Sequence, residues 1–477
     1  MMNFREYINY YTNSDMEHHS DMNALSPLDS KRYHSICKCI SDVYNEQRYY
    51  ELRIKIAISY ASKILPVITG NQCDEQLFKN DLESTENKNA LPSIDQLYAE
   101  IIEEEKITRH DVGAINNVLR RYVSEKYRNV IHIGLTSQDL NSLATTIMFH
   151  DACMVCIDRM TPLFDAFNRL IECSKITFMT RTHSQAAIPD NLGRFLKFFV
   201  QKIGKNFEKL IFLVQNTMTY KMGGATGNLT ALRNVLSQNS ASKHIDLDVI
   251  ITQISQQISQ ELSSDCKTKY TRSSTTTQID DYSSYIDILS TIHVLNTNIY
   301  ELCDNLWLLV RDGVLKQRKI DGSVGSSTMP HKTNPIDLEQ VFATTKICKC
   351  LCDASIEILG KNRDCRMISD SFACRTLPEV FGYFILVMHS CTKGVNNLDP
   401  DHDTIQKYLN DNKASLAEYY QTGLRVQSIT DESLHGINAY KELENLTKGK
   451  NVEYDVYDRI ISELKLNVKR ITIESYV

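Results

Sequence analysis

The residues best suited to chemistry lie in the short run 325–335, which reads Gly-Ser-Ser-Thr-Met-Pro-His-Lys-Thr-Asn-Pro. Two serines, Ser326 and Ser327, and a lysine, Lys332, precede Asn334, which together with the proline after it is typical of a helix N-terminus. Free backbone N–H groups and the helix dipole make such an end attractive to anions. We therefore predict a hydroxyl-bearing loop that binds an anion where a helix begins. The alternative is an ordinary Gly/Ser loop with a helix cap.

Four further clusters combine histidine, carboxylate, hydroxyl or guanidinium groups in or beside predicted loops. They are the runs Thr108-Arg109-His110-Asp111, Thr136-Ser137-Gln138-Asp139 and Arg181-Thr182-His183-Ser184-Gln185, and the set Arg366, Ser371 and Arg375. Histidine suits proton transfer near neutral pH, and guanidinium forks match phosphate oxygens. Hydroxyl and N–H groups at helix starts suit carboxylates. Each cluster alone is also typical of a solvated surface, but together they indicate a site for a polyanion that undergoes acid–base elimination.

Long helices must position these clusters, because the 477 residues include only 17 glycines and 9 prolines. Two apolar stripes repeat at steps of three and four residues, the pattern of a helical seam. The first is Ile288, Ile292, Leu295, Ile299, Leu302, Leu306 and Leu309; the second is Leu192, Phe195, Phe199, Ile203, Phe207, Leu210 and Val214. We predict a helical bundle whose first seam packs between subunits as well as within one. A bundle confined to one chain is the alternative.

The fold class predicted is all-α, with a central long-helix bundle and two smaller flanking helical domains. We expect a helical domain at 1–130, the bundle at 131–393 and a C-terminal helical domain at 394–477, after the boundary marked by the Asn-Asp-Pro-rich stretch at 396–400. Polar composition predicts a loose arm at 1–24 and a surface loop at 71–95.

Composition excludes several functions. A net charge of −6 gives no general case for nucleic-acid binding. The N-terminus lacks the apolar region of a signal peptide, and we expect that no stretch approaches the length of a membrane span. The 14 cysteines include a C-x-x-C at Cys153 and Cys156 and an alternating run at 348–352, but neither has a partner pair at zinc-site spacing. Reduced cysteines without a metal are therefore expected, which fits a cytoplasmic location.

The run 325–335 resembles the fumarase/aspartase superfamily signature GSSxMPxKxNP. Its His331-Lys332 pair is similar to the adenylosuccinate lyase branch, whereas argininosuccinate lyases tend to show Gln-Lys, fumarases Gly-Lys and aspartases Ala-Lys. The resemblance extends from about residue 24 to 460. Its other matches are Ser26-Pro27-Leu28-Asp29 with Arg32-Tyr33, the T-x-H-D-like run at 108–111, the T-S-x-D-like run at 136–139, the R-T-H-like run at 181–183, Thr277-Gln278-Ile279, the set Arg366, Ser371 and Arg375, and the stretch 440–450.

The resemblance implies a homotetramer whose active sites combine three subunits. It implies β-elimination of fumarate from adenylosuccinate to give AMP, and cleavage of the related succinylaminoimidazole carboxamide ribotide, without a cofactor. His183 is assigned as the acid, Ser326 as the base with Ser327 as the alternative, and His110 and Lys332 as further catalytic groups. The predicted substrate-binding residues are Arg32, Tyr33, Arg109, Asp111, Thr136, Ser137, Gln278, Ser327, Met329, Asn334, Arg366, Ser371 and Arg375.

Some positions depart from the superfamily pattern. Ser184 and Ala186 replace the usual glycine and proline after His183, Gln138 stands where an acidic residue is common, and residues 280–282 differ from a Pro-His-Asp type of run. One residue more than usual separates Asp29 from the Arg-Tyr pair. Two other functions stay open: another superfamily lyase, such as an argininosuccinate lyase, and a catalytically inactive structural protein on the same scaffold.

Overall fold

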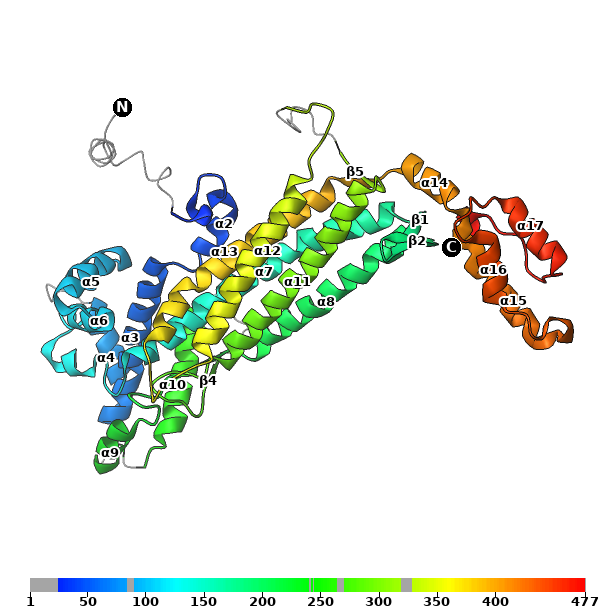
Figure 1. The fold of residues 1–477 in the computed structure, drawn as a ribbon. Helices are drawn as coiled ribbons and strands as arrows, with labels where there is room; N and C mark the ends of the chain where they lie inside the picture. The colour runs from blue at the N-terminus through cyan, green and yellow to red at the C-terminus, as the bar shows by residue number, and fades with distance from the viewer. Residues whose placement is uncertain are drawn as a thin grey trace. The chain divides into compact units, whose positions relative to one another are not determined.

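The computed structural model describes residues 25–83, 90–239, 242, 244–263, 270–318 and 328–476. Helices dominate this part of the chain, which confirms the all-α prediction (Figure 1). The chain divides into two compact units. Unit 1 comprises Met1–Arg159, Asn206–Asn296 and Thr344–Leu386, and unit 2 comprises Met160–Lys205, Thr297–Ala343 and Val387–Val477.

Five long helices contribute a segment to each unit. They are α7 (Ser137–Cys173), α8 (Leu192–Asn216), α11 (Ser283–Arg311), α12 (Ile336–Leu359) and α13 (Ser369–Asn396). Both predicted seams lie on these helices, the first on α11 and the second on α8. The periodicity therefore located the long helices correctly.

Unit 1 adds shorter elements to its segments of the long helices. They are η2 (Pro27–Asp29), α2 (His34–Ser41), α3 (Glu46–Thr69), α4 (Asp74–Glu83), α5 (Ile94–Thr108), α6 (Asp111–Leu119), η3 (Glu125–Val130), β3 (Thr219–Tyr220), α9 (Thr230–Gln238), α10 (Leu247–Leu262) and β4 (Thr271–Arg272). Strands β3 and β4 pair in parallel. The stretch 71–95, predicted as a loop, contains α4, whose Phe78 and Leu82 are buried. That prediction was wrong because two apolar side chains per three turns suffice to anchor a polar helix.

The core of unit 1 lies where α7, α11, α12 and α13 pack together. The Phe149 ring of α7 lies 5.1 Å from Phe381 of α13 and 4.3 Å from Tyr285 of α11. On α11, Asn296 donates from Nδ2 to the Cys348 sulfur of α12 at 3.3 Å. These contacts tie four helices into one bundle (Figure 1).

The α11 seam is covered within a single chain. Its side chains from Ile288 to Leu306 are at most 1% exposed, and only Leu309 at its end is partly accessible. A side chain with no accessible surface in one chain cannot also contact a partner subunit. The prediction that this seam packs between subunits was therefore wrong, because periodicity identifies an apolar face but not what covers it.

Unit 2 also consists of parts of the long helices and shorter elements. The latter are β1 (Thr177–Thr182), β2 (Gln185–Asn191), β5 (Leu315–Gln317), β6 (Leu398–Pro400), α14 (His402–Asp411), η4 (Lys413–Leu416), α15 (Ala417–Thr430), η5 (Glu432–Leu434), α16 (Ala439–Thr447), α17 (Tyr454–Glu463) and η6 (Ile473–Ser475). The pairs β1–β2 and β5–β6 are antiparallel. Stacked rings of Tyr420 and Tyr457, 4.4 Å apart, join α15 to α17.

Helices α7 and α13 are each long and apolar enough to cross a membrane, contrary to the expectation from the sequence. Of their most apolar windows, 78% and 61% are buried inside the protein. Such burial is typical of the core helices of a soluble bundle, which pass the same length and composition test.

Candidate active site

A cavity of about 510 Å³ in unit 1 brings four sequence-distant segments together, and we call it the arginine cavity. Its lining is Glu105, Arg109, His110, Asp111, Ser137, Asn141, Gln278, Arg366, Ile368, Ser371 and Arg375. Eight of these residues were predicted as site residues: Arg109, His110, Asp111, Ser137, Gln278, Arg366, Ser371 and Arg375. Three guanidinium groups and a histidine at one cavity suit an anionic ligand.

The corner between α5 and α6 holds the histidine. Helix α5 ends at Thr108, its C-cap Arg109 has a left-handed backbone (φ 51°), and His110 then caps α6. The His110 Nδ1 atom accepts a hydrogen bond from the Gly113 backbone N–H at 3.1 Å. An accepting Nδ1 places the proton of a neutral imidazole on Nε2. The exposed His110 ring can therefore offer an N–H donor to a ligand.

Asp111 lies beside His110 and pairs with two arginines. Its Oδ2 atom is 2.6 Å from Arg53 Nη1 and 3.6 Å from Arg375 Nη2, and its Oδ1 atom is 3.6 Å from His110 Nδ1. Burial alone would raise the pKa of the Asp111 carboxyl, but the charge and hydrogen bond of Arg53 outweigh burial, so the pKa lies below its ordinary value. Asp111 is therefore ionised at neutral pH.

A buried ion pair fixes the start of α7. Asp139 and Lys221 have no exposed surface and lie 2.7 Å apart. The Asp139 carboxylate also accepts hydrogen bonds from the backbone N–H groups of Thr136 (2.6 Å), Gly223 (2.7 Å) and Gly224 (3.1 Å). Burial lowers the pKa of Lys221, although Asp139 opposes that shift. The pair thus holds the loop that presents Ser137, whereas Thr136, predicted to bind substrate, does not line the cavity.

The start of α13 supplies the rest of the arginine cavity. Ser371 and Arg375 are one turn apart on this helix, and Arg366 lies in the segment that precedes it. The Gln278 backbone N–H donates to the Cys365 carbonyl at 3.2 Å and draws the two loops together. All three residues of the predicted Arg/Ser/Arg set nevertheless reach the cavity.

Asp370 explains one departure from the superfamily pattern. Its buried Oδ2 atom accepts hydrogen bonds from Gln138 Nε2 at 2.7 Å and from the Tyr282 hydroxyl at 2.9 Å. An acidic side chain at position 138 would place two carboxylates together in a buried position, which is costly. The amide of Gln138 instead donates to Asp370 and links α7 to α13.

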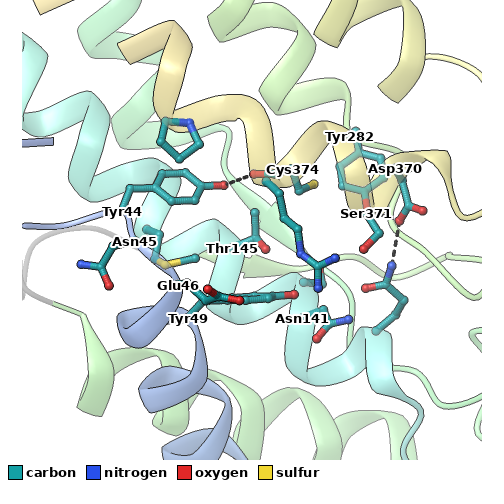
Figure 2. Close-up of a pocket in the computed structure, with 15 residues that line it drawn as sticks. Tyr44, Asn45, Glu46, Tyr49, Asn141, Thr145, Tyr282, Asp370, Ser371 and Cys374 are labelled. Carbon is teal, nitrogen blue, oxygen red and sulfur yellow. Dashed lines mark hydrogen bonds between the residues drawn. The ribbon is translucent and has the colours of Figure 1, made fainter. Parts of the chain in front are cut away.

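A second cavity, which we call the tyrosine cavity, has a volume of about 360 Å³. Figure 2 shows the residues that line it. Both cavities are lined by Asn141, Ser371 and Arg375. Figure 2 shows the Tyr44 hydroxyl turned toward the Cys374 carbonyl, to which it donates at 2.7 Å. Burial raises the pKa of Tyr44 well above its usual value and that of Tyr49 to about 12, so both phenols are neutral donors.

Known proteins match this chain along nearly its whole length. A family model described as lyase matches residues 89–350, and a model described as adenylosuccinate lyase C-terminal matches residues 362–477. The chain belongs to the lyase family, in its adenylosuccinate lyase branch. An adenylosuccinate lyase of Dictyostelium discoideum is 27% identical over 96% of this chain and 97% of that protein. One of Legionella pneumophila (strain Corby) is 26% identical over 95% and 96%.

Solved structures are similar in fold. A fumarate lyase from Mesorhizobium sp. BNC1 matches with a TM-score of 0.67 at 13% identity, covering 89% of this lyase and 90% of that chain. At that level of identity the likeness concerns the fold alone. It agrees with the all-α bundle that α7, α11, α12 and α13 form.

The superfamily signature of this lyase is only partly described. Ser326 and Ser327 lie outside the described residues. Met329, Lys332 and Asn334 lie in unit 2, in the segment before α12, and Met329 is exposed. Helix α12 begins at Ile336, and the Pro335 carbonyl accepts the first helical hydrogen bond, from Glu339 N–H at 3.1 Å. The helix thus starts one residue later than predicted, with Pro335 rather than Asn334 at the cap.

His183 also belongs to unit 2, at the tip of the β1–β2 hairpin. It forms a two-residue turn with Ser184, and their φ angles are 50° and 63°. Glycine is favoured at such positions, so Ser184 adopts a backbone conformation that the usual glycine would adopt more readily. Arg181 braces the turn by donating from Nη1 to the Ser184 carbonyl at 3.0 Å and by pairing with Asp312 at 3.0 Å. The His183 side chain is exposed.

Two further predicted residues, close together in the sequence, also lie outside both cavities. Arg32 and Tyr33 precede α2, and the Arg32 guanidinium lies 5.8 Å from the centre of the Tyr33 ring. Neither residue lines the arginine or the tyrosine cavity. In the described part of the chain, no group of three or more His, Cys, Asp or Glu side chains could hold a metal ion.

Sequence reasoning missed three ionic residues that organise the site: Arg53, Lys221 and Asp370. Each is buried, and each has its partner far away in the sequence. Arg53 left no clear signal in the sequence, because it stands between two other charged residues, Glu51 and Lys55.

Proposed function

We propose that this protein cleaves adenylosuccinate to AMP and fumarate by β-elimination, as a carbon–nitrogen lyase of purine nucleotide biosynthesis. The observation that best supports this function is the arginine cavity, with Arg109, Arg366 and Arg375 around His110. Adenylosuccinate carries one phosphate and two carboxylates, and a cavity lined by three guanidinium groups suits a ligand with this much negative charge. The family models and the relatives named adenylosuccinate lyase support the same reaction.

The proposed roles follow from the chemistry of each group. Arg366, Ser371 and Arg375 bind the phosphate, with Arg32 and Tyr33 as further contacts, since guanidinium and hydroxyl donors match its oxygens. Ser137 and Gln278 donate hydrogen bonds to the succinyl carboxylates. Arg109 and Asp111 shape the wall beside them, and Asp111 keeps Arg375 in place through its charge.

Elimination needs a base for the Cβ proton and an acid for the leaving nitrogen. We assign Ser326 as the base, with Ser327 as the alternative, and His183 as the acid. Charge develops on the carboxylate next to the attacked carbon, where Lys332 and Asn334 provide a cation and a donor. A serine is a weak base unless its alkoxide is stabilised, so Lys332 is also needed for activation. His110 offers its Nε2–H to the substrate.

We also propose a homotetramer whose active sites combine three subunits. Large apolar side chains lie exposed on α8, α12 and α13: Phe198, Phe212, Ile336, Ile347 and Phe372. Burial of such side chains between subunits would be favourable. In this arrangement His183 and the signature segment complete the cavity of a neighbouring chain. The free cysteines of the described part of the chain favour a cytoplasmic location.

Purified protein should be incubated separately with adenylosuccinate, succinylaminoimidazole carboxamide ribotide and argininosuccinate. We expect the first two to yield fumarate together with AMP and the carboxamide ribotide, respectively. Cleavage of argininosuccinate alone would reassign the protein to another superfamily activity. Binding of AMP without cleavage of any substrate would indicate an inactive scaffold.

A further inference from the structure

The inference concerns Arg53 of α3, which lies directly behind the arginine cavity. This residue has no exposed surface, although its guanidinium group is charged at all physiological pH values. Nη1 contacts Asp111 Oδ2 at 2.6 Å and Asn141 Oδ1 at 3.3 Å. In the described part of the chain, its buried Nε and Nη2 atoms have no hydrogen-bond partner.

Two aromatic rings enclose the guanidinium group. Its Cζ atom lies 4.0 Å from the centre of the Tyr49 ring and 4.2 Å from that of the Tyr50 ring. Cation–π contacts offset part of the cost of burying the charge, and the rings fix the plane of the guanidinium. Arg53 therefore pairs with one carboxylate, and the two rings restrict its guanidinium group to this orientation.

Stability alone does not explain this arrangement. A buried ion pair is often no more stable than well-packed apolar residues of similar volume, and two guanidinium nitrogens here remain unpaired. The carboxylate that Arg53 contacts, however, lines the arginine cavity next to His110 and Arg375. The position of the ion pair thus indicates a role in the site.

We propose that Arg53 is a positioning residue of the active site, which keeps the Asp111 carboxylate ionised and aimed between His110 and Arg375. This inference rests on the proposed function for its kinetic test. Arg53 touches no substrate, because it does not line either cavity. It acts through Asp111, whose charge in turn holds the exposed Arg375 for phosphate binding.

Among the groups around Asp111, Arg53 is the cation that stabilises the Asp111 carboxylate most strongly. The titratable and charged groups around it are Arg53, Tyr49 and Tyr50 from α3, Glu105 from α5, Arg109 at the C-cap of α5, His110 at the N-cap of α6, and Arg375 from α13. Arg375 is 59% exposed and 3.6 Å from Asp111, so water screens its charge. Arg53 is fully buried at 2.6 Å and is screened far less.

The test is the pH dependence of kcat/KM for adenylosuccinate in the wild type, Arg53→Met and Arg53→Lys. Loss of an adjacent opposite charge raises a carboxyl pKa by roughly one to three units. Protonation of Asp111 would then begin at a higher pH, so the acid limb of the Arg53→Met profile should move up by about that amount. Arg53→Lys retains a cation and should show a smaller shift.

Arg48→Met is the matched control. Arg48 lies on the same helix, forms a 2.7 Å ion pair with the buried Asp151, and lines neither cavity. We expect a lower melting temperature but an unchanged acid limb for this variant. An unchanged acid limb in active Arg53→Met would overturn the proposal, because a purely structural Arg53 would affect only stability.

If Arg53→Met does not fold, Asp111→Asn is compared with the double variant Arg53→Met/Asp111→Asn. Removing both charges avoids an unpaired buried ion, and the two profiles should coincide if Arg53 acts through Asp111. A further loss of kcat/KM or a different acid limb in the double variant would contradict the proposal. If the wild type itself lacks turnover, the proposed function fails, and calorimetric AMP affinity against pH then tests Arg53 with the same expected shift.

Discussion

Replacement of Arg375 by alanine tests the proposed phosphate site quantitatively. The Arg375 guanidinium lines both cavities, is 59% exposed, and lies 3.6 Å from Asp111, beyond hydrogen-bond distance. Its donors are therefore available to a ligand. A hydrogen bond between charged groups is worth about 1.5–3 kcal/mol, or roughly 10- to 150-fold in affinity. Because Arg375 is exposed, we expect a loss of AMP affinity of about 10-fold, near the lower end.

Arg366→Ala should weaken AMP binding more, since the Arg366 side chain is only 18% exposed. Isothermal titration calorimetry with AMP and with adenosine distinguishes the contribution of the phosphate to binding affinity from that of the nucleoside. Both variants should lose affinity for AMP but bind adenosine like the wild type. Arg363→Ala, at an exposed position outside both cavities, is the matched control. Equal AMP affinity of the wild type and both cavity variants would refute the phosphate site.

Four other predictions concern catalysis and stability. His183→Ala should lower kcat by roughly 10²- to 10⁴-fold while AMP still binds, and a wild-type kcat would exclude His183 as the acid. Ser326→Ala should abolish elimination without loss of adenylosuccinate binding. If Ser327→Ala is inactive and Ser326→Ala is active, the base is Ser327. If both variants remain active, neither serine is the base, and His110 is the next candidate. Ile299→Asp should unfold the chain, because Ile299 has no exposed surface and an unpaired buried charge costs several kcal/mol. An unchanged melting temperature, measured by circular dichroism, would contradict the core position of Ile299. Ser184→Gly should stabilise the protein by about 1 kcal/mol by relieving a left-handed φ of 63°, and a lower melting temperature would argue against strain in the hairpin turn.

The long helices could be predicted from the sequence because their apolar periodicity is local. Helices α8 and α11 span the two sequence segments in which the apolar stripes were identified. The partner of a seam is not local information, however, so the interfacial role of Ile299 was predicted wrongly. The β1–β2 hairpin was missed because its turn uses His183 and Ser184 instead of the glycine that is typical of hairpin turns. The three-domain division remains a prediction.

The arginine cavity was predictable to the extent that its residues occur in motif clusters. His110, Ser137, Gln278 and Arg375 come from four distant segments, and only the chemistry they share indicated that they meet. Arg53 could not be placed in this way, because it is a single charge whose carboxylate partner is 58 positions away. The same holds for Lys221 and Asp139, 82 positions apart by their numbering. Such pairs become visible only once the helices are packed.

The most direct test of the proposed active site is a crystal structure of the protein with AMP and fumarate bound. We predict that the AMP phosphate lies within hydrogen-bond distance of Arg366, Ser371 and Arg375, with fumarate near Ser137 and His110. Density for both ligands at a position away from the arginine cavity would contradict this assignment of the site.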